Sequence, residues 1–206
     1  MQSTREDKVN FTAQYLDEAI EILKQLDQTA IERIVELLVR TRERGGRVFF
    51  LGVGGGAGHA SHAVNDFRKI DGIEAYTPSD NVSELTARIN DEGWETAYAN
   101  WLRGSHLTRD DLVFIFSVGG GDAERNISAN LVRALQHAKS VGANICGVVG
   151  RDGGYTKQVA DACVVVPTVN SATVTPHTES FQALIWHLLA SHPSLRMAEM
   201  KWESTR

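Results

Sequence analysis

The chain has 206 residues, 42% of them hydrophobic, and a formal net charge of −5. This length is enough for one α/β domain with a full core, and the negative charge argues against a nucleic-acid partner bound by a basic face. No apolar run approaches the roughly 20 residues of a membrane helix, and the N-terminus is not typical of a signal peptide. We therefore expect a soluble, cytoplasmic protein that contacts neither a membrane nor nucleic acid.

Residues 1–45 precede the first predicted strand and show helical spacing of their apolar side chains. One helix is expected over residues 11–26 and a second from about residue 29 to residue 44, separated by a break and cap at residues 27–29. A long apolar helix ahead of the first strand has no sheet of its own to cover. It either packs on a neighbouring subunit or forms a lid on the same subunit.

Residues 47–66 contain the pattern that organises the chain. An apolar run at residues 48–51 predicts a strand buried on both faces of a parallel sheet. A glycine-rich turn follows, and then a helix that carries His62 and Asp66. Free N–H groups and a helix dipole that meet at such a turn form an anion site, for which the candidates are Gly54, Gly55 and Gly56. His62 and Asp66 share one helix face and could bind one metal ion, although a lone pair of this kind is more often a surface hydrogen bond.

Four further strands are predicted, at residues 74–76, 111–117, 144–149 and 162–166. They alternate with helices expected at residues 82–89, 126–141, 155–160 and 178–189 and with an aromatic helix that carries Trp94, Tyr98 and Trp101; residues 90–93 are expected to form a turn. This alternation predicts a parallel sheet covered by helices on both faces, a three-layer α/β/α sandwich. We expect a single domain over residues 1–206, with leading helices at 1–45 and the α/β core at 46–206.

The two cysteines, Cys146 and Cys163, both lie in apolar runs typical of core strands. We expect buried thiols in a reducing compartment, and neither a disulfide nor a metal-binding pair.

A second junction between a strand and a glycine turn follows the strand at residues 111–117. Parallel sheets bind ligands at the carboxyl ends of their strands, and two glycine-rich turns there suggest a phosphate group. The donors at this junction are hydroxyls and backbone amides, from Ser117, Gly119, Gly120, Gly121 and Ser128. Asp122 and Glu124 oppose an anion unless they point away, and Arg125 could offset one of them.

The last predicted helix carries Glu179 and His187, eight residues apart and therefore roughly 80° apart around the helix axis. Both side chains can face one cleft. Taken alone, a glutamate and a histidine on an apolar helix are more often a surface cap and a core histidine with satisfied hydrogen bonds.

Together these motifs resemble the sugar isomerase (SIS) domain family, and within it the phosphoheptose isomerases. The resemblance rests on the glycine turn at residues 52–55, His62 with Asp66, Asn90 with Asp91, the loop at residues 117–121 and the late helix with His187. It covers nearly the whole chain. It implies a five-stranded parallel sheet, leading helices that build a homotetramer, and interconversion of sedoheptulose 7-phosphate and D-glycero-D-manno-heptose 7-phosphate.

The resemblance also implies a zinc site made by His62, Asp66, Glu179 and His187. Two of these four residues depart from the family, which has glutamate at the position of Asp66 and glutamine at that of Glu179. Both replacements can bind zinc through oxygen. The serine-rich phosphate loop of the family is replaced by Ser117-Val118-Gly119-Gly120-Gly121, and Gly56 stands where the family has a serine, so hydroxyl donors are missing.

The resemblance implies an isomerisation through an enediol, in which Asp66 and His187 move protons and zinc polarises the oxygens. A metal-bound carboxylate is a weak base, so Asp66 is either the base or only a ligand. His187 is our candidate for proton transfer, and Asn90 and Asp91 are candidates for holding substrate hydroxyls. Two other functions stay open: an isomerase or epimerase of another sugar phosphate, and a SIS-domain binding module without catalysis.

Overall fold

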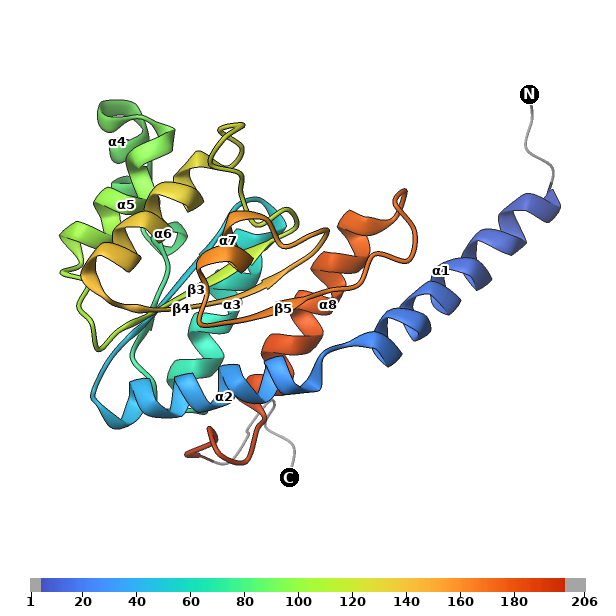
Figure 1. Cartoon of the computed structure of the whole chain (residues 1–206), viewed down its shortest axis with the longest axis horizontal. Coiled ribbons are helices and arrows are strands. Elements are labelled where there is room, and N and C mark those ends of the chain that lie inside the picture. The colour runs from blue at the N-terminus through green and yellow to red at the C-terminus, as the bar shows by residue number, and fades with distance from the viewer. Residues whose placement is uncertain (1–4, 199–206) are drawn as a thin grey trace.

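The computed structural model describes residues 5–198, which form one five-stranded sheet with helices on both faces (Figure 1). All strand pairs are parallel, in the order β2-β1-β3-β4-β5. The strands are β1 (Val48–Gly52), β2 (Ala75–Tyr76), β3 (Leu112–Ser117), β4 (Asn144–Val149) and β5 (Ala162–Val165). The predicted five strands are confirmed, as is the α/β sandwich.

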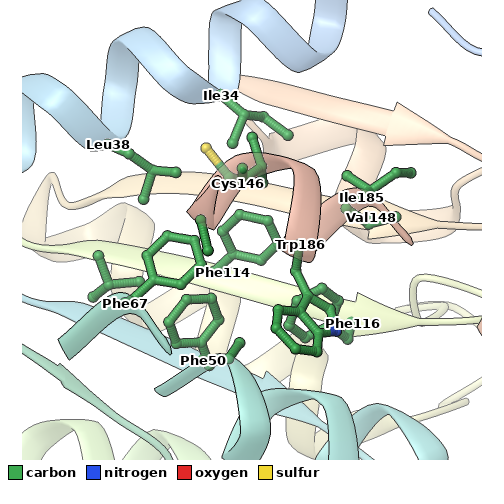
Figure 2. Close-up of a cluster of buried hydrophobic side chains, with 14 of the residues drawn as sticks. Ile34, Leu38, Phe50, Phe67, Phe114, Phe116, Cys146, Val148, Ile185 and Trp186 are labelled. Atoms are coloured by element: carbon green, nitrogen blue, oxygen red, sulfur yellow. The ribbon is translucent and has the colours of Figure 1, made fainter. Parts of the chain in front are cut away.

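Helices cover the first face of the sheet with one apolar core (Figure 2). They are α2 (Gln28–Glu43), α3 (Gly55–Lys69) and α8 (Val174–Ala190). Helix α2 begins at Asp27, whose carboxylate accepts the amide N–H of Ala30 at 3.0 Å and so caps the helix where the sequence predicts. Figure 2 shows Ile34 and Leu38 of this helix above the phenylalanines of β1 and β3, with Trp186 of α8 beside them.

A second core lies between the other face of the sheet and a further set of helices, around Phe49, Leu51, Val113 and Ile115. These helices are α4 (Val82–Glu92), α5 (Trp94–Gly104), α6 (Ala129–Val141) and α7 (Gly154–Val159), and the short 3₁₀ helix η1 (Pro78–Asp80) precedes them. Strand side chains that point to opposite faces are buried in different cores, which is why the strand sequences are continuous apolar runs.

Helix α1 (Arg5–Gln25) projects away from this body (Figure 1). Its end nearest α2 is anchored by the buried Ile22, while large apolar side chains elsewhere on the helix stay exposed to solvent: Phe11, Leu16, Ile20 and Leu23. The helix also contacts its own subunit, where Glu18 accepts hydrogen bonds from Asn170 and Thr173.

The bounds of four helices differ from the prediction. Helix α1 begins at Arg5, six residues earlier than expected. Helix α4 continues to Glu92 and ends at Gly93, so the turn predicted at residues 90–93 is a last helical turn. Helix α6 begins only at Ala129, because Asn126 and Ser128 adopt left-handed backbone conformations with φ of 55° and 49°. Helix α8 begins at Val174, four residues earlier than predicted. Pro176 is tolerated in the first turn, because the N–H group that proline lacks would have no helical acceptor there.

Both cysteines are free thiols, Cys146 buried in β4 and Cys163 partly buried in β5. Burial raises the pKa of Cys146 well above its usual range and that of Cys163 to about 12, so both are protonated, unreactive core residues at neutral pH. Among the described residues, no helix combines the length and the apolar character needed to cross a membrane.

Candidate functional site

The site lies at the carboxyl ends of β1 and β3, where the strand order reverses. The chain runs from β1 to β2 on one side and then returns to place β3 on the other side of β1, with Gly52 paired to Phe116. Such a reversal opens a crevice beyond the strand ends, the usual ligand position in parallel sheets. The two glycine-rich segments predicted from the sequence meet at this crevice.

The first glycine turn fits its surroundings closely. Gly54 has a φ of 59° and precedes the first residue of α3, a conformation that glycine adopts at little cost. A Cβ atom on Gly56 would lie 2.4 Å from the carbonyl oxygen of Phe116, so α3 touches the backbone of β3 directly. The hydroxyl of Tyr98 on α5 donates to the Gly52 carbonyl at 2.7 Å and fixes the end of β1.

The amides of this turn are partly paired within the turn itself. Gly56 donates to Val53, and Ala57 donates to Gly54. Of the three candidates, Gly56 is therefore not the free donor expected from the sequence, while the amides of Gly54 and Gly55 donate to no acceptor within the described residues. Gly56 lines a cavity described below; Gly54 and Gly55 do not, and Gly55 instead faces the Glu179 carboxylate.

The second glycine segment keeps free donors. The hydroxyl of Ser117 accepts the amide N–H of Gly120 at 3.0 Å, and the Gly120 carbonyl accepts from both the amide and the hydroxyl of Thr156. The amides of Gly119 and Gly121 donate to no acceptor within residues 5–198. Two backbone amides and the Ser128 hydroxyl thus remain for an anion, which agrees with the predicted phosphate loop in kind but with fewer hydroxyls.

The carboxylate of Asp122, which was expected to oppose anion binding, accepts hydrogen bonds within its own turn. It accepts the amides of Glu124 and Arg125, each at 2.9 Å, and it lies 3.7 Å from the guanidinium of Arg125. Arg125 therefore offsets one of the two acids, as predicted.

Two cavities open beside this loop. The smaller has a volume of about 180 Å³ and is lined by Val53, Gly56, Ser117, Val118, Gly119, Ser128, Glu179 and Gln182. The larger, about 990 Å³, shares Val118, Gly119 and Ser128 with it and continues past Gly121, Arg125 and Arg151. The two cavities form a path that runs from Glu179 past the second glycine segment.

A compact group of metal-type donors lies in the second half of α3 and near the end of α8. One donor atom each from His62, Asp66 and His187 falls within 4.8 Å of the others, and His62 Nε2 is 3.9 Å from Asp66 Oδ2. The ring of Trp186 lies against both histidine rings, with centroid distances of 4.6 Å to His62 and 3.4 Å to His187. The structure thus joins three of the four predicted metal ligands.

The chemistry of this group fits a zinc ion. Asp66 is 2% exposed and its Oδ2 has no hydrogen-bond partner in the described chain, a costly state for a buried carboxylate oxygen unless a cation or a donor occupies it. His187 Nδ1 is 2.8 Å from the carbonyl of Ala183; this contact orients the ring and turns Nε2 outward as a ligand. Two imidazoles and one carboxylate are a typical catalytic zinc set that leaves a position open.

Glu179, the fourth predicted ligand, is not part of this three-residue group. It lines the smaller cavity. Its carboxylate lies against Gly55, so close that a Cβ atom on Gly55 would be 2.6 Å from the Glu179 Cδ. His59 links the two places, since it interacts with the backbone of Glu179 and lies near His62 and His187. Burial lowers the pKa of His59, partly opposed by Glu179, so the ring is neutral at pH 7.

Asn90 and Asp91 lie in the last turn of α4, and Asn90 donates to the Asp91 carboxylate at 2.7 Å. Neither residue lines the two cavities described above, and α4 lies well apart from α8 (Figure 1). Within one subunit the structure does not bring them to the metal-type group.

A family model of the SIS domain matches residues 14–150 of the chain. The chain belongs to the SIS-domain family. The phosphoheptose isomerase of Helicobacter pylori strain Shi470 is 30% identical over 177 residues, which cover 84% of this SIS-domain chain and 86% of that protein. The lincomycin biosynthesis protein LmbN of Streptomyces lincolnensis is also 30% identical, over 89% of this chain and 69% of that protein.

Solved structures agree on the SIS-domain fold. A phosphoheptose isomerase from Francisella tularensis superposes with a TM-score of 0.76 at 22% identity, covering 91% of this chain and 97% of that one. One from Neisseria gonorrhoeae gives 0.75 at 22% identity, with the same coverage.

Two residues of this SIS domain had no role in the sequence analysis. His59 precedes His62 by one helical turn, and Gln182 follows Glu179 by one turn. Helical spacing from an already recognised site residue is the signal that could have found both.

Proposed function

We propose that this SIS-domain protein is a cytoplasmic aldose–ketose isomerase that converts sedoheptulose 7-phosphate to D-glycero-D-manno-heptose 7-phosphate. The observation that carries the proposal is the grouping of His62, Asp66 and His187 on helices α3 and α8. The same two helices contribute Gly56, Glu179 and Gln182 to the smaller cavity at the second glycine segment. The named activity of the 30% identical relatives supports the same substrate. We treat residues 1–206 as a single SIS domain.

His187 is the proposed proton carrier. Its Nδ1 is turned to the Ala183 carbonyl, so its Nε2 is the nitrogen that can take a proton from one substrate oxygen and return it to the other while it is not bound to zinc. Asp66, buried beside it, either removes the proton next to the carbonyl or serves only as a ligand. The stacked Trp186 ring limits rotation of the His187 ring and keeps water from one side of it.

A zinc ion would be held by His62, Asp66 and His187, with Glu179 as the proposed fourth ligand. When bound, it supplies Lewis-acid polarisation of the reacting carbonyl and hydroxyl oxygens. Glu179 would have to turn from its position beside Gly55 to join the other three.

The phosphate group is proposed to bind the second glycine segment. Free amides at Gly119 and Gly121 and the hydroxyl of Ser128 are suitable donors to its oxygens. Gly54, Gly55, Gly56, Ser117 and Gly120 complete the proposed substrate-binding set, together with Asn90 and Asp91.

We also propose a homo-oligomer, in keeping with the predicted tetramer. Four large apolar side chains on the projecting helix α1 are 51–58% exposed, and their burial against a second copy would be favourable.

Isomerase activity with sedoheptulose 7-phosphate is the decisive test. We expect turnover that a chelator removes and added zinc restores. The control for inactivation by unfolding is the fold of the chelated protein, which we expect to stay intact while turnover is lost. A folded, zinc-loaded protein that leaves sedoheptulose 7-phosphate unchanged would contradict the heptose substrate and favour another sugar phosphate.

Alanine at Gly55 is expected to weaken binding of sedoheptulose 7-phosphate about tenfold with little change in stability. The added Cβ would lie 2.6 Å from the end of the flexible Glu179 side chain and displace its carboxylate. Gly58→Ala, one turn further along α3, is the matched control because its Cβ would meet no atom within 4 Å. Calorimetric titration and thermal unfolding of both variants measure the two effects. Equal affinities of the two variants would remove Glu179 from the site.

A further inference from the structure

Gln182 on α8 has an unusual environment for an amide side chain. It is 0% exposed, and its Nε2 donates to the carbonyl of Val148 on β4 at 3.0 Å. Because a carbonyl can only accept a hydrogen bond, this contact fixes the amide orientation and assigns Oε1 to the other side. Oε1 has no donor within residues 5–198.

The same residue forms part of the wall of the smaller cavity, together with Glu179 and residues of the second glycine segment. A buried amide oxygen without a donor is destabilising, and folded proteins supply a partner for nearly all such atoms. Since the protein provides none for Oε1, the donor has to come from whatever occupies the cavity.

We propose that Gln182 is a substrate-binding residue whose Oε1 accepts a hydrogen bond from a hydroxyl of the sugar chain. The hydroxyl is one that lies between the reacting carbons near His187 and the phosphate on the second glycine segment. This inference rests on the proposed function, because it needs a polyhydroxylated phosphate ester as the ligand. It adds a specificity element: a hydrogen-bonded site discriminates strongly against a ligand that lacks the hydroxyl, since the buried acceptor then stays unpaired.

The substitution Gln182→Met tests the proposal because methionine has nearly the same shape and no acceptor of comparable strength. The change removes the unpaired oxygen together with the bond to Val148, so the thermal midpoint of the protein is expected to change little. The KM for sedoheptulose 7-phosphate is expected to rise about tenfold, while kcat stays within about twofold, because the bond is equally strong in substrate and transition state. Gln136→Met on the exposed side of α6 is the control for the same chemical change away from the cavity.

Direct binding separates this inference from the proposed function. The wild-type protein and both variants are titrated calorimetrically with sedoheptulose 7-phosphate and, separately, with inorganic phosphate. We expect Gln182→Met to lose about tenfold in affinity for the sugar phosphate and to keep its affinity for inorganic phosphate, which carries no sugar hydroxyl. Equal affinity of Gln182→Met and wild type for the sugar phosphate, or a fall in thermal midpoint with unchanged KM, would overturn the role of Gln182 and leave the isomerase intact. A wild-type protein that binds no sugar phosphate would overturn both.

Discussion

Replacement of His187 by alanine is expected to reduce kcat with sedoheptulose 7-phosphate by about 10²–10⁴-fold, the range typical of a lost general acid–base group. The ring is held between the Ala183 carbonyl and Trp186, with one nitrogen directed to the group that includes Asp66. Initial rates at saturating substrate measure the effect.

The control for this experiment is His192→Ala. His192 lies just beyond α8 and faces Glu32 on α2 at 3.6 Å, so its loss should leave turnover unchanged. Bound zinc is determined in parallel, because His187 is also a proposed ligand. Wild-type turnover by His187→Ala would exclude the residue from proton transfer.

The variant Asp66→Asn distinguishes the two roles left open for Asp66. Asparagine keeps an oxygen that can bind a metal but cannot act as a base at neutral pH. Loss of turnover with zinc still bound would identify Asp66 as the base.

Replacement of Asp71 by asparagine is expected to raise the free energy of unfolding at pH 8 by up to about 4 kcal/mol. The Asp71 carboxyl is 0% exposed, and neither of its oxygens has a hydrogen-bond partner in the described chain. Burial, opposed by Arg42 and assisted by the charge of Asp66, raises the pKa of Asp71 to about 7 from an ordinary value of 3.8.

The sign of the pH dependence follows from proton binding. Between pH 4 and 7 the folded protein holds a proton on Asp71 that the unfolded chain has released, so wild-type stability falls as the pH rises through this window. Asparagine does not titrate, and its advantage is therefore full above pH 7 and less than half as large at pH 5. Urea unfolding at both pH values, with EDTA present and with the exposed Asp110→Asn as control, measures it. An advantage of equal size at pH 5 and pH 8 would contradict a raised pKa.

The sequence predicted the sheet well because each strand combines a continuous apolar run with a glycine or polar stop, and a strand buried on both faces needs that composition. The boundaries that were wrong depend on local polar contacts or on backbone conformations, which the apolar pattern does not encode. Arg88, for example, pairs with Glu84 and Glu92 on α4 and holds together the turn at residues 90–92. The antiparallel bridge between Asp122 and Ile127 delays the start of α6.

The candidate site could be predicted only in part for a similar reason. Helical spacing brings His62 and Asp66 together, and it correctly puts His187 and Glu179 on neighbouring faces of α8. Spacing says nothing about how tightly α3 lies against the opposite backbone, and this packing decides that Glu179 faces Gly55 and not the other three ligands. The orphaned oxygen of Gln182 depends on its bond to Val148, a contact across 34 residues that no local pattern encodes.

The anchor of α1 has a practical consequence for anyone who shortens this protein. Glu18 accepts hydrogen bonds from Asn170 and Thr173 and lies 3.0 Å from the buried His177, and these bonds, Asn170 first, lower its pKa to about 2. A version shortened to begin at residue 26 would lack the exposed apolar side chains of α1. It would also leave Asn170, Thr173 and His177 without their acceptor near the start of α8. Polar substitutions of the exposed apolar residues of α1 that keep Glu18 would reduce aggregation and so favour crystallisation. The contacts of Glu18 near the start of α8, the helix that carries His187, would be kept.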